Sequence, residues 1–224
     1  MTTTSQTLKE MYRAMHGRFG HQGWWPGDGP LEICIGAILT QNTNWTNVEK
    51  AIANLRQAGA LSVGALLAIP PTRLAELIKP AGYFNIKARR LGNFISAVHR
   101  GFGQDIQSFL DRPIEILREE LLSINGIGRE TADSIILYAA RKPSFVVDAY
   151  THRILWRHML IGPQDDYESI KQLVESSLPE DVELWNDYHA QLVAVGKNYC
   201  RPRARCEGCP LEGFAHDPDP CGEG

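Results

Sequence analysis

The chain has 224 residues, of which 43% are hydrophobic and 22% are charged, a composition typical of soluble globular proteins. Its formal net charge of −3 lacks the positive excess common among nucleic-acid-binding proteins, so such binding would depend on local basic clusters. The apolar run at residues 31–39 is too short to span a bilayer and contains Glu32, and the first residues lack the basic-then-apolar order of a signal peptide. We expect a cytoplasmic protein with no membrane association.

Nearly every segment with periodic hydrophobicity predicts a helix, beginning with a buried one at residues 31–39. The pattern Thr46-x-x-Glu49 predicts a capping box at the start of the next helix. Later helices are predicted from apolar side chains spaced three or four residues apart, namely Val48, Ile52 and Leu55; Leu91, Phe94, Ile95 and Val98; Ile116, Leu117 and Leu121; Ile135, Ile136 and Ala139; and Val147, Ile154 and Leu155. No segment alternates convincingly between apolar and polar residues, so the sequence predicts an all-α fold class.

A glycine turn separates two of these helices, in the stretch SINGIGRETAD at residues 123–133. Glycines at 126 and 128 would allow the backbone to approach a nucleic-acid phosphate closely, and amides at the start of the second helix could donate to it. An ordinary helical hairpin packed in a core is the alternative. Glu130 falls in the first turn of the second helix, where a carboxylate complements the helix dipole.

Asp148 lies in the stretch FVVDAYTH, immediately before an apolar periodic segment. One interpretation is a helix N-cap. The other is a carboxylate fixed at a helix start and facing a cleft. The two are compatible, because a capping residue is rigidly held.

Four of the five cysteines occur after residue 199, with the spacing Cys200-x5-Cys206-x2-Cys209-x11-Cys221. Sulfur ligands at such spacing can hold a tetrahedral zinc ion or an iron–sulfur cluster. Because the last gap is long, His216 competes with Cys221 as the fourth ligand.

Three tryptophans lie near loop ends, in HQGWWPG at residues 21–27 and QNTNW at residues 41–45. Trp24, Trp25 and Trp45 are interpreted either as core residues or as the walls of a slot that stacks a flat ring.

Together these stretches, over residues 28–210, resemble the endonuclease III superfamily of helix-hairpin-helix DNA glycosylases. SINGIGRETAD resembles the family hairpin, and FVVDAYTHRIL resembles the segment with the catalytic aspartate. ILTQNT is similar to the loop whose glutamine fills the gap left by an extruded base, which maps to Gln41. AGYFNIKA is similar to the second wedge loop, which maps to Tyr83. The terminal cysteines resemble the [4Fe–4S] loop, although the first gap is one residue shorter and the last six residues longer than usual in the family.

The resemblance implies two helical domains with a DNA-binding groove between them. Residues 29–141 would form a six-helix domain with the helix-hairpin-helix motif, in which Gly126, Ile127, Gly128 and Arg129 contact DNA. Residues 1–28 and 142–224 would form a second helical domain, which carries the C-terminal iron–sulfur loop. The partner implied is double-stranded DNA with a damaged base, bound by a monomer.

The resemblance also implies the chemistry. Bifunctional members carry a lysine at the position of Glu130, and a carboxylate cannot form the Schiff base through which that lysine cuts the strand. We therefore expect a monofunctional glycosylase in which Asp148 is catalytic and strand cleavage at abasic sites is weak or absent.

A WWP motif, an aromatic residue after QNT and a Gly-Lys pair after His189 are similar to the 3-methyladenine glycosylase branch. That similarity assigns Trp24, Trp25, Trp45 and Lys197 to a base pocket for an alkylated purine. An oxidised-pyrimidine substrate, a catalytically weak lesion-binding protein and an iron–sulfur sensor remain as alternatives.

Overall fold

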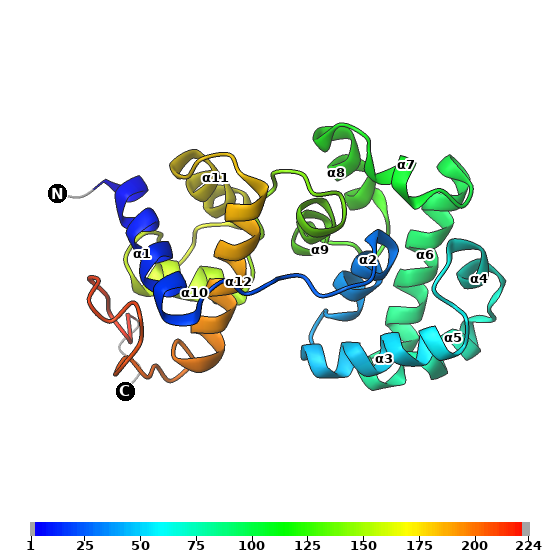
Figure 1. Cartoon of the computed structure of the whole chain (residues 1–224), viewed down its shortest axis with the longest axis horizontal. Coiled ribbons are helices and arrows are strands. Elements are labelled where there is room, and N and C mark those ends of the chain that lie inside the picture. The colour runs from blue at the N-terminus through cyan, green and yellow to red at the C-terminus, as the bar shows by residue number, and fades with distance from the viewer. Residues whose placement is uncertain (1–2, 221–224) are drawn as a thin grey trace. The chain divides into compact units, whose positions relative to one another are not determined.

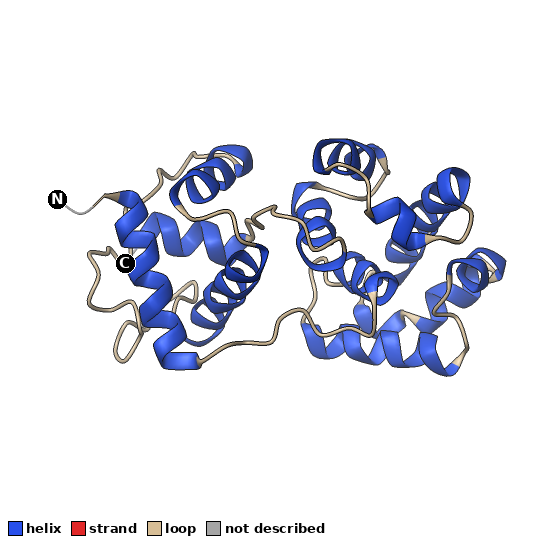
Figure 2. Ribbon diagram, turned by 45° about the horizontal axis from the view of Figure 1, so that its top comes forward, coloured by secondary structure: helices blue, strands red, loops and turns tan. Residues whose placement is uncertain are grey.

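The computed structural model describes residues 3–220, and within that range the regular elements are all helices (Figure 2). The prediction of an all-α fold is thereby confirmed for the described part of the chain. The chain divides into two compact units. Residues 25–142 form the middle unit, and the residues before Trp25 together with those after Lys142 form the terminal unit. None of the described helices is both long enough and apolar enough to cross a membrane.

The middle unit is built around α6, which packs against α2, α4 and α5 (Figure 1). The apolar face predicted on this helix is buried at Leu91, Phe94, Ile95 and Val98. The unit's helices are α2 (Pro30–Leu39), α3 (Trp45–Gln57), α4 (Val63–Ala68), α5 (Pro71–Leu77), η1 (Lys79–Ala81), α6 (Phe84–Phe102), α7 (Ile106–Leu110), α8 (Ile114–Ser123), α9 (Arg129–Ser134) and η2 (Ile135–Ala139).

The predicted capping box at Thr46-x-x-Glu49 is wrong. Helix α3 starts two residues earlier than expected, because Asn44 is its N-cap and accepts a hydrogen bond from the backbone N–H of Asn47 at 3.0 Å. Glu49 accepts instead from the indole N–H of Trp45 at 2.9 Å. Asn44 and Thr46 are both good capping residues, and the earlier one prevails.

The terminal unit consists of α1 (Thr4–Phe19), α10 (Ala149–Arg157), α11 (Tyr167–Ser177) and α12 (Val182–Asn198). Helix α12 packs against α1 and α10 (Figure 1). Gly196 permits a close approach of α10, because a Cβ atom at this position would lie 2.2 Å from Cδ1 of Tyr150. A larger residue would therefore separate α12 from α10, the helix that begins at Asp148.

The hairpin of the middle unit is formed by α8 and α9. Its two helices are joined by an ion pair in which Arg118 donates to both carboxylate oxygens of Asp133, at 2.9 Å and 3.1 Å. The Asp133 side chain is fully buried. Such a two-point contact fixes orientation as well as distance. The ion pair therefore fixes the two helices on either side of the turn relative to each other.

Candidate functional site

Asp148 is the N-cap of α10, as the sequence predicts. Its Oδ1 accepts from the backbone N–H of Thr151 at 2.7 Å and from the Thr151 hydroxyl at 2.9 Å. Its Oδ2 lies 3.6 Å from Nε2 of His189, a buried residue of α12. One oxygen is thus occupied by the cap, while the other is directed toward an imidazole.

This environment keeps Asp148 ionised. Its side chain is only 13% exposed, and burial by itself would raise the pKa of the carboxyl. The neighbouring His189 and the two Thr151 donors outweigh that effect, so the pKa of Asp148 is lowered from its ordinary value. A buried carboxylate that stays charged can stabilise a positive charge that develops beside it.

The two glycines of the hairpin turn differ in their structural role. Gly126 has a φ of +101°, and a Cβ there would lie 2.2 Å from Cγ of Arg90, so the fold itself requires glycine. Gly128 has an ordinary φ of −93°, and no described residue lies within 4 Å of a Cβ built on it. Packing within the described part of the chain therefore does not require glycine at position 128.

The side chains around the turn also differ. The side chain of Ile127 is buried in the core of the middle unit, so only its backbone is available to a partner. Arg129 and Glu130 are exposed in the first turn of α9.

Gln41 is attached to this hairpin. Its Nε2 donates to the carbonyl of Gly126 at 3.1 Å and to the hydroxyl of Thr131 at 2.9 Å. Its Oε1 accepts from Arg90. The glutamine loop and the hairpin turn are thus a single hydrogen-bonded assembly within the middle unit, and Arg90 is a further member of it that no motif in the sequence indicates.

Whereas Gln41 is hydrogen-bonded to the hairpin, Tyr83 is exposed and has a strained backbone. It has a φ of +44° in the left-handed region, which is unfavourable for a residue with an aromatic side chain, and the residue is 67% exposed. Residues held in strained backbone conformations are concentrated at functional sites. Its position at the N-cap of α6 places the ring at the end of a rigid helix.

A buried lysine connects the loops of Gln41 and Tyr83. The ammonium group of Lys87 donates to the carbonyl of Leu39 at 2.9 Å and to that of Ala81 at 2.7 Å. These carbonyls come two residues before Gln41 and Tyr83. Lys87 is 1% exposed, so its charge is used inside the middle unit and not at the surface.

The three tryptophans fall into two groups, each in its own unit. In the middle unit, the Trp25 ring lies 5.0 Å from Trp45 in an edge-to-face arrangement and 5.0 Å from Tyr138. All three pack near α2, where a Cβ on Gly36 would lie 3.1 Å from Trp25 and 3.3 Å from Trp45. Trp25 and Trp45 are partly buried, and Trp45 packs against the core of the middle unit.

In the terminal unit, the ammonium group of Lys197 lies 5.7 Å from the ring centroid of Trp24, within the range of a cation–π contact. The resemblance places Trp24 and Lys197 in one predicted pocket, and these two side chains lie together in the structure. Lys197 follows Gly196, the residue that accommodates Tyr150.

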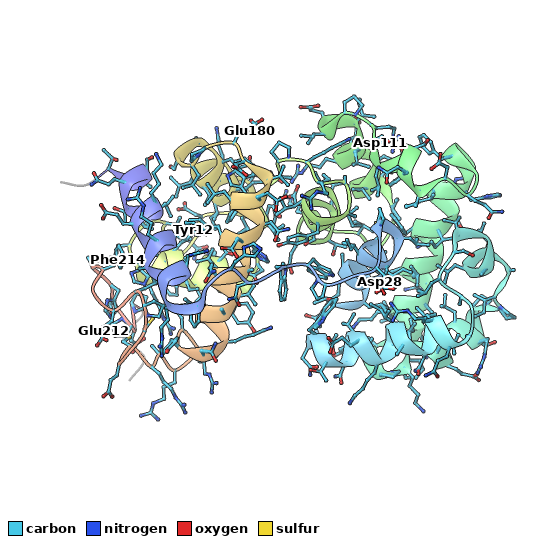
Figure 3. The ribbon with its side chains drawn as sticks, in the orientation of Figure 1. Tyr12, Asp28, Asp111, Glu180, Glu212 and Phe214 are labelled. Carbon is cyan, nitrogen blue, oxygen red and sulfur yellow. The ribbon has the colours of Figure 1, made fainter. Side chains whose placement is uncertain are left out.

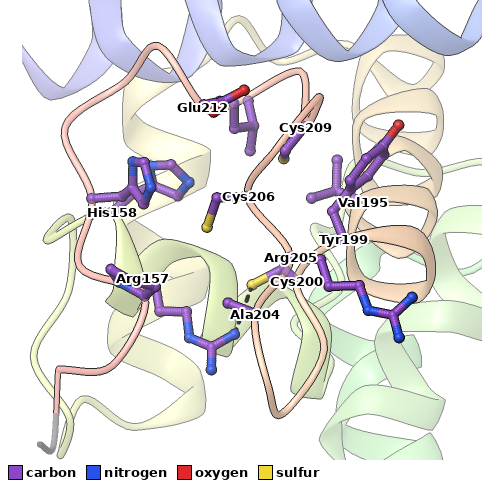
Figure 4. A pocket seen from close by; sticks show the side chains of 13 residues that line it. Arg157, His158, Val195, Tyr199, Cys200, Ala204, Arg205, Cys206, Cys209 and Glu212 are labelled. Atoms are coloured by element: carbon purple, nitrogen blue, oxygen red, sulfur yellow. Dashed lines mark hydrogen bonds between the residues drawn. The ribbon is translucent and has the colours of Figure 1, made fainter.

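The cysteine loop surrounds a cavity in the terminal unit (Figure 4). Cys200, Cys206 and Cys209 line it together with His158 and His216. The pKa values of the Cys206 and Cys209 thiols are raised by burial and by the negative charge of neighbouring cysteines, which reflects their closeness.

Arg157 anchors the cysteine loop to α10. It donates to the sulfur of Cys200 at 3.3 Å and to the carbonyls of Arg201 and Pro202, both at 2.6 Å. A guanidinium directed at a sulfur would offset the negative charge of a thiolate site. The donor set therefore suits a thiolate-bound metal centre.

The fourth ligand has two candidates. His216 lines the cavity, and its Nδ1 lies 2.8 Å from the carbonyl of Phe214, which leaves Nε2 as the nitrogen for a metal. Cys221 lies outside the described residues.

The model of the HhH-GPD superfamily of base excision DNA repair proteins matches residues 35–180. A protein of Methanocaldococcus jannaschii, whose name describes it as a candidate DNA repair glycosylase, is 44% identical over 93% of this chain and 96% of its own length. Endonuclease III of Thermotoga maritima is 30% identical over 82% of this chain and 81% of its own length.

Solved structures agree with these relatives. A 3-methyladenine DNA glycosylase of H. pylori, bound to 1,N6-ethenoadenine, matches with a TM-score of 0.75 and 26% identity over 88% of this chain and 98% of its own. An endonuclease III–DNA complex matches with a TM-score of 0.82 over 98% of each chain, and at 21% identity this likeness concerns the fold. The chain therefore belongs to the HhH-GPD superfamily of base excision DNA repair proteins.

Proposed function

We propose that this protein is a monofunctional DNA glycosylase that hydrolyses the N-glycosidic bond of a damaged base in double-stranded DNA. The geometry of Asp148 carries the proposal. A carboxylate that is mostly buried, held by Thr151 and kept ionised beside His189 has the properties needed at a centre where positive charge develops.

Asp148 would act on the sugar rather than on the base. As the base departs, positive charge accumulates on the deoxyribose, and Oδ2 would stabilise that charge and orient the attacking water. Oδ1 stays occupied by its two Thr151 hydrogen bonds, so the carboxylate cannot rotate away. His189 would fix the direction of Oδ2.

Glu130 supports the assignment as a hydrolase without a lyase step. It occupies the first turn of α9, at the position where the resemblance places the Schiff-base lysine. A carboxylate cannot form an imine with the sugar, and the neighbouring Arg129 cannot replace the lysine because a guanidinium remains protonated.

The aromatic residues favour an alkylated purine as the substrate. Trp25 and Trp45 offer partly buried π surfaces, which pack against each other beside the buried Tyr138, and such surfaces attract a base that methylation has made cationic. A cationic base also leaves with little assistance from an acid, so the proposed mechanism needs no residue that acts as a strong general acid. The likeness to the H. pylori 3-methyladenine glycosylase points in the same direction.

A [4Fe–4S] cluster is the proposed cofactor of the cysteine loop. Cys200, Cys206 and Cys209 would hold it, with Cys221 or His216 as the fourth ligand. When bound, the cluster would cross-link the loop; in the chain itself, Arg157 holds the loop against α10. The loop would then present the exposed Arg201, Arg203 and Arg205 to the DNA phosphates.

The proposal is tested with duplexes that each contain one damaged base, either an alkylated purine or an oxidised pyrimidine. Free base is measured first, and strand breaks are measured with and without alkali. We expect release of alkylated purines and strand breaks only after alkali. Preferential release of oxidised pyrimidines would overturn the substrate assignment. Tight duplex binding without release of any base would instead indicate a lesion-binding protein.

A further inference from the structure

A group of two histidines and one aspartate in the terminal unit consists of residues other than those of the active site and the cysteine loop. His16 lies in the last turn of α1, His21 follows the end of that helix, and Asp187 lies on α12. Their potential ligand atoms all lie within 4.8 Å of one another. The cluster forms because α1 packs against α12 and Gly20, with a φ of +69°, turns the chain back toward α12.

Asp187 is the fixed member of this cluster. Its side chain is only 2% exposed. Its Oδ2 accepts from the hydroxyl of Tyr12 at 2.9 Å and from Gln191 at 3.2 Å (Tyr12 is labelled in Figure 3). Its Oδ1 accepts from the backbone N–H of Gln22 at 2.9 Å. These donors hold the carboxylate plane in one orientation.

The charge of Asp187 has no permanent cation to balance it. Within the described residues, its partners include neither lysine nor arginine, and the nearest basic group is His21, whose Nδ1 lies 3.2 Å from Oδ1. Buried carboxylates are normally paired with a cation or coordinated to a metal. A metal ion would supply the missing positive charge.

The spacing of the atoms suits a metal. Zinc binds imidazole nitrogen and carboxylate oxygen at about 2.0–2.2 Å, so two ligands on adjacent corners of a tetrahedron lie about 3.3–3.6 Å apart. The separation of 3.2 Å between Nδ1 of His21 and Oδ1 of Asp187 is close to the short end of that range, so a small outward movement of the His21 ring would admit the ion. The His21 side chain is 62% exposed and can adjust without disturbing the core.

We propose that His16, His21 and Asp187 bind a transition-metal dication such as Zn²⁺, and that the ion fastens the segment leading from α1 to Trp24. Imidazole and carboxylate together favour zinc, nickel or copper, whereas magnesium and calcium prefer oxygen ligands throughout. On binding, Nδ1 of His21 coordinates through its lone pair and the ring proton resides on Nε2. Solvent water completes the coordination.

The position of the site explains why it would matter for the rest of the unit. His21 is three residues before Trp24, whose ring contacts Lys197. The intervening segment is already attached to α12 through Gln22, and Gln191 donates to the carbonyl of Gly20 at 2.7 Å. A metal bridge from α1 to α12 through His21 would restrict this segment further.

Zinc binding is measured by calorimetry on the full chain as isolated, in the absence of DNA. We expect one Zn²⁺ site that is lost in the His16→Ala/His21→Ala double variant and retained in His99→Ala, which removes an exposed histidine of the middle unit. Loss of an outer partner of a metal ligand already costs roughly 10–100-fold in affinity, so each single variant should lose at least as much. Equal Zn²⁺ binding by all variants would overturn the proposal, as would equally tight binding of Mg²⁺ or Ca²⁺.

Two further measurements make the test independent of folding and of base excision. Tyr12→Phe leaves all three ligands in place but removes a donor that orients Asp187, and it should weaken Zn²⁺ binding by about tenfold. Hydrogen exchange should show slower exchange of the Gln22 amide when Zn²⁺ is added to the wild-type chain, with no change in His21→Ala. Unchanged exchange in the wild-type chain would refute the fastening of the segment.

Discussion

Replacing the buried Lys87 by methionine tests whether one side chain holds both loops of the middle unit. Methionine retains the apolar stem of lysine but cannot donate to the carbonyls of Leu39 and Ala81. Hydrogen bonds from a charged donor contribute about 1.5–3 kcal/mol each, and part of this loss is recovered because an ammonium no longer has to be buried. We expect Lys87→Met to lower the free energy of unfolding by about 2–3 kcal/mol.

Thermal unfolding measures this change directly. For a protein of this size, each kcal/mol corresponds to about 2–4 °C, so the Tm should fall by roughly 5–10 °C. Lys50→Met is the matched control, because Lys50 is exposed on α3, and its Tm should be unchanged. Lesion-duplex affinity should fall in Lys87→Met by a larger factor than undamaged-duplex affinity, since the two carbonyls precede Gln41 and Tyr83. A Tm equal to that of Lys50→Met would refute the reasoning.

The stability difference between the wild-type chain and Lys87→Met should change with pH in a defined direction. Burial and the charge of Arg90 lower the pKa of Lys87 to about 8. Between about pH 8 and pH 10.5, the unfolded lysine therefore binds more protons than the folded one, and its contribution to stability rises with pH. The neutral amine still has two N–H donors for its two carbonyls. The stability difference between the wild-type chain and Lys87→Met should thus grow across this interval, and a shrinking difference would contradict the assigned pKa shift.

Three other predictions concern the active site and the cysteine loop. Asp148→Asn should retain the fold and duplex binding while base release falls by about 10²–10³-fold. Because burial is outweighed by His189 and Thr151 and the pKa of Asp148 is lowered, the wild-type rate should show no loss through this group in the pH range where an ordinary aspartate begins to be protonated. Activity near that of the wild-type chain would reduce Asp148 to a helix cap. Borohydride should trap little covalent enzyme–DNA adduct, and strong trapping would reveal an amine nucleophile despite Glu130. Purified protein should be brown with broad visible absorption, which Cys206→Ser should abolish; colourless protein containing zinc would exclude the cluster.

The features that the sequence predicted well are those that depend on neighbouring residues. The N-cap at Asp148 and the glycine turn at Gly126 are local, because a cap bonds three residues ahead and a turn spans a few residues. The cavity shared by Cys200, Cys206 and Cys209 follows from ligand spacing on one short loop. Patterns of this kind can be recognised directly in the sequence.

The features that were missed depend on contacts between distant segments. Arg90 meets Gln41 from 49 residues away, and His189 approaches Asp148 from another helix. Lys87 lies among basic residues in the sequence, and only the fold reveals that it is buried. The prediction at Thr46 is wrong for a different reason, since two capping residues stand close together and asparagine, the better N-cap of the two, is the one used.

The division of the chain has a consequence for its biosynthesis. The middle unit is one continuous segment, whereas the terminal unit combines the beginning of the chain with its last third. During synthesis, residues 25–142 can fold as soon as they emerge, because all the contacts within that unit are already present. Helix α1 can pack only after α12 has been synthesised. For example, the hydroxyl of Tyr188 on α12 donates a hydrogen bond to the carbonyl of Leu8 on α1, 180 residues away. The entropic cost of joining such distant segments increases only as the logarithm of their separation, and prior folding of the middle unit shortens the flexible chain between them. The part of the protein that holds Asp148 and the cysteine loop is therefore expected to form last, after the hairpin of α8 and α9 is complete.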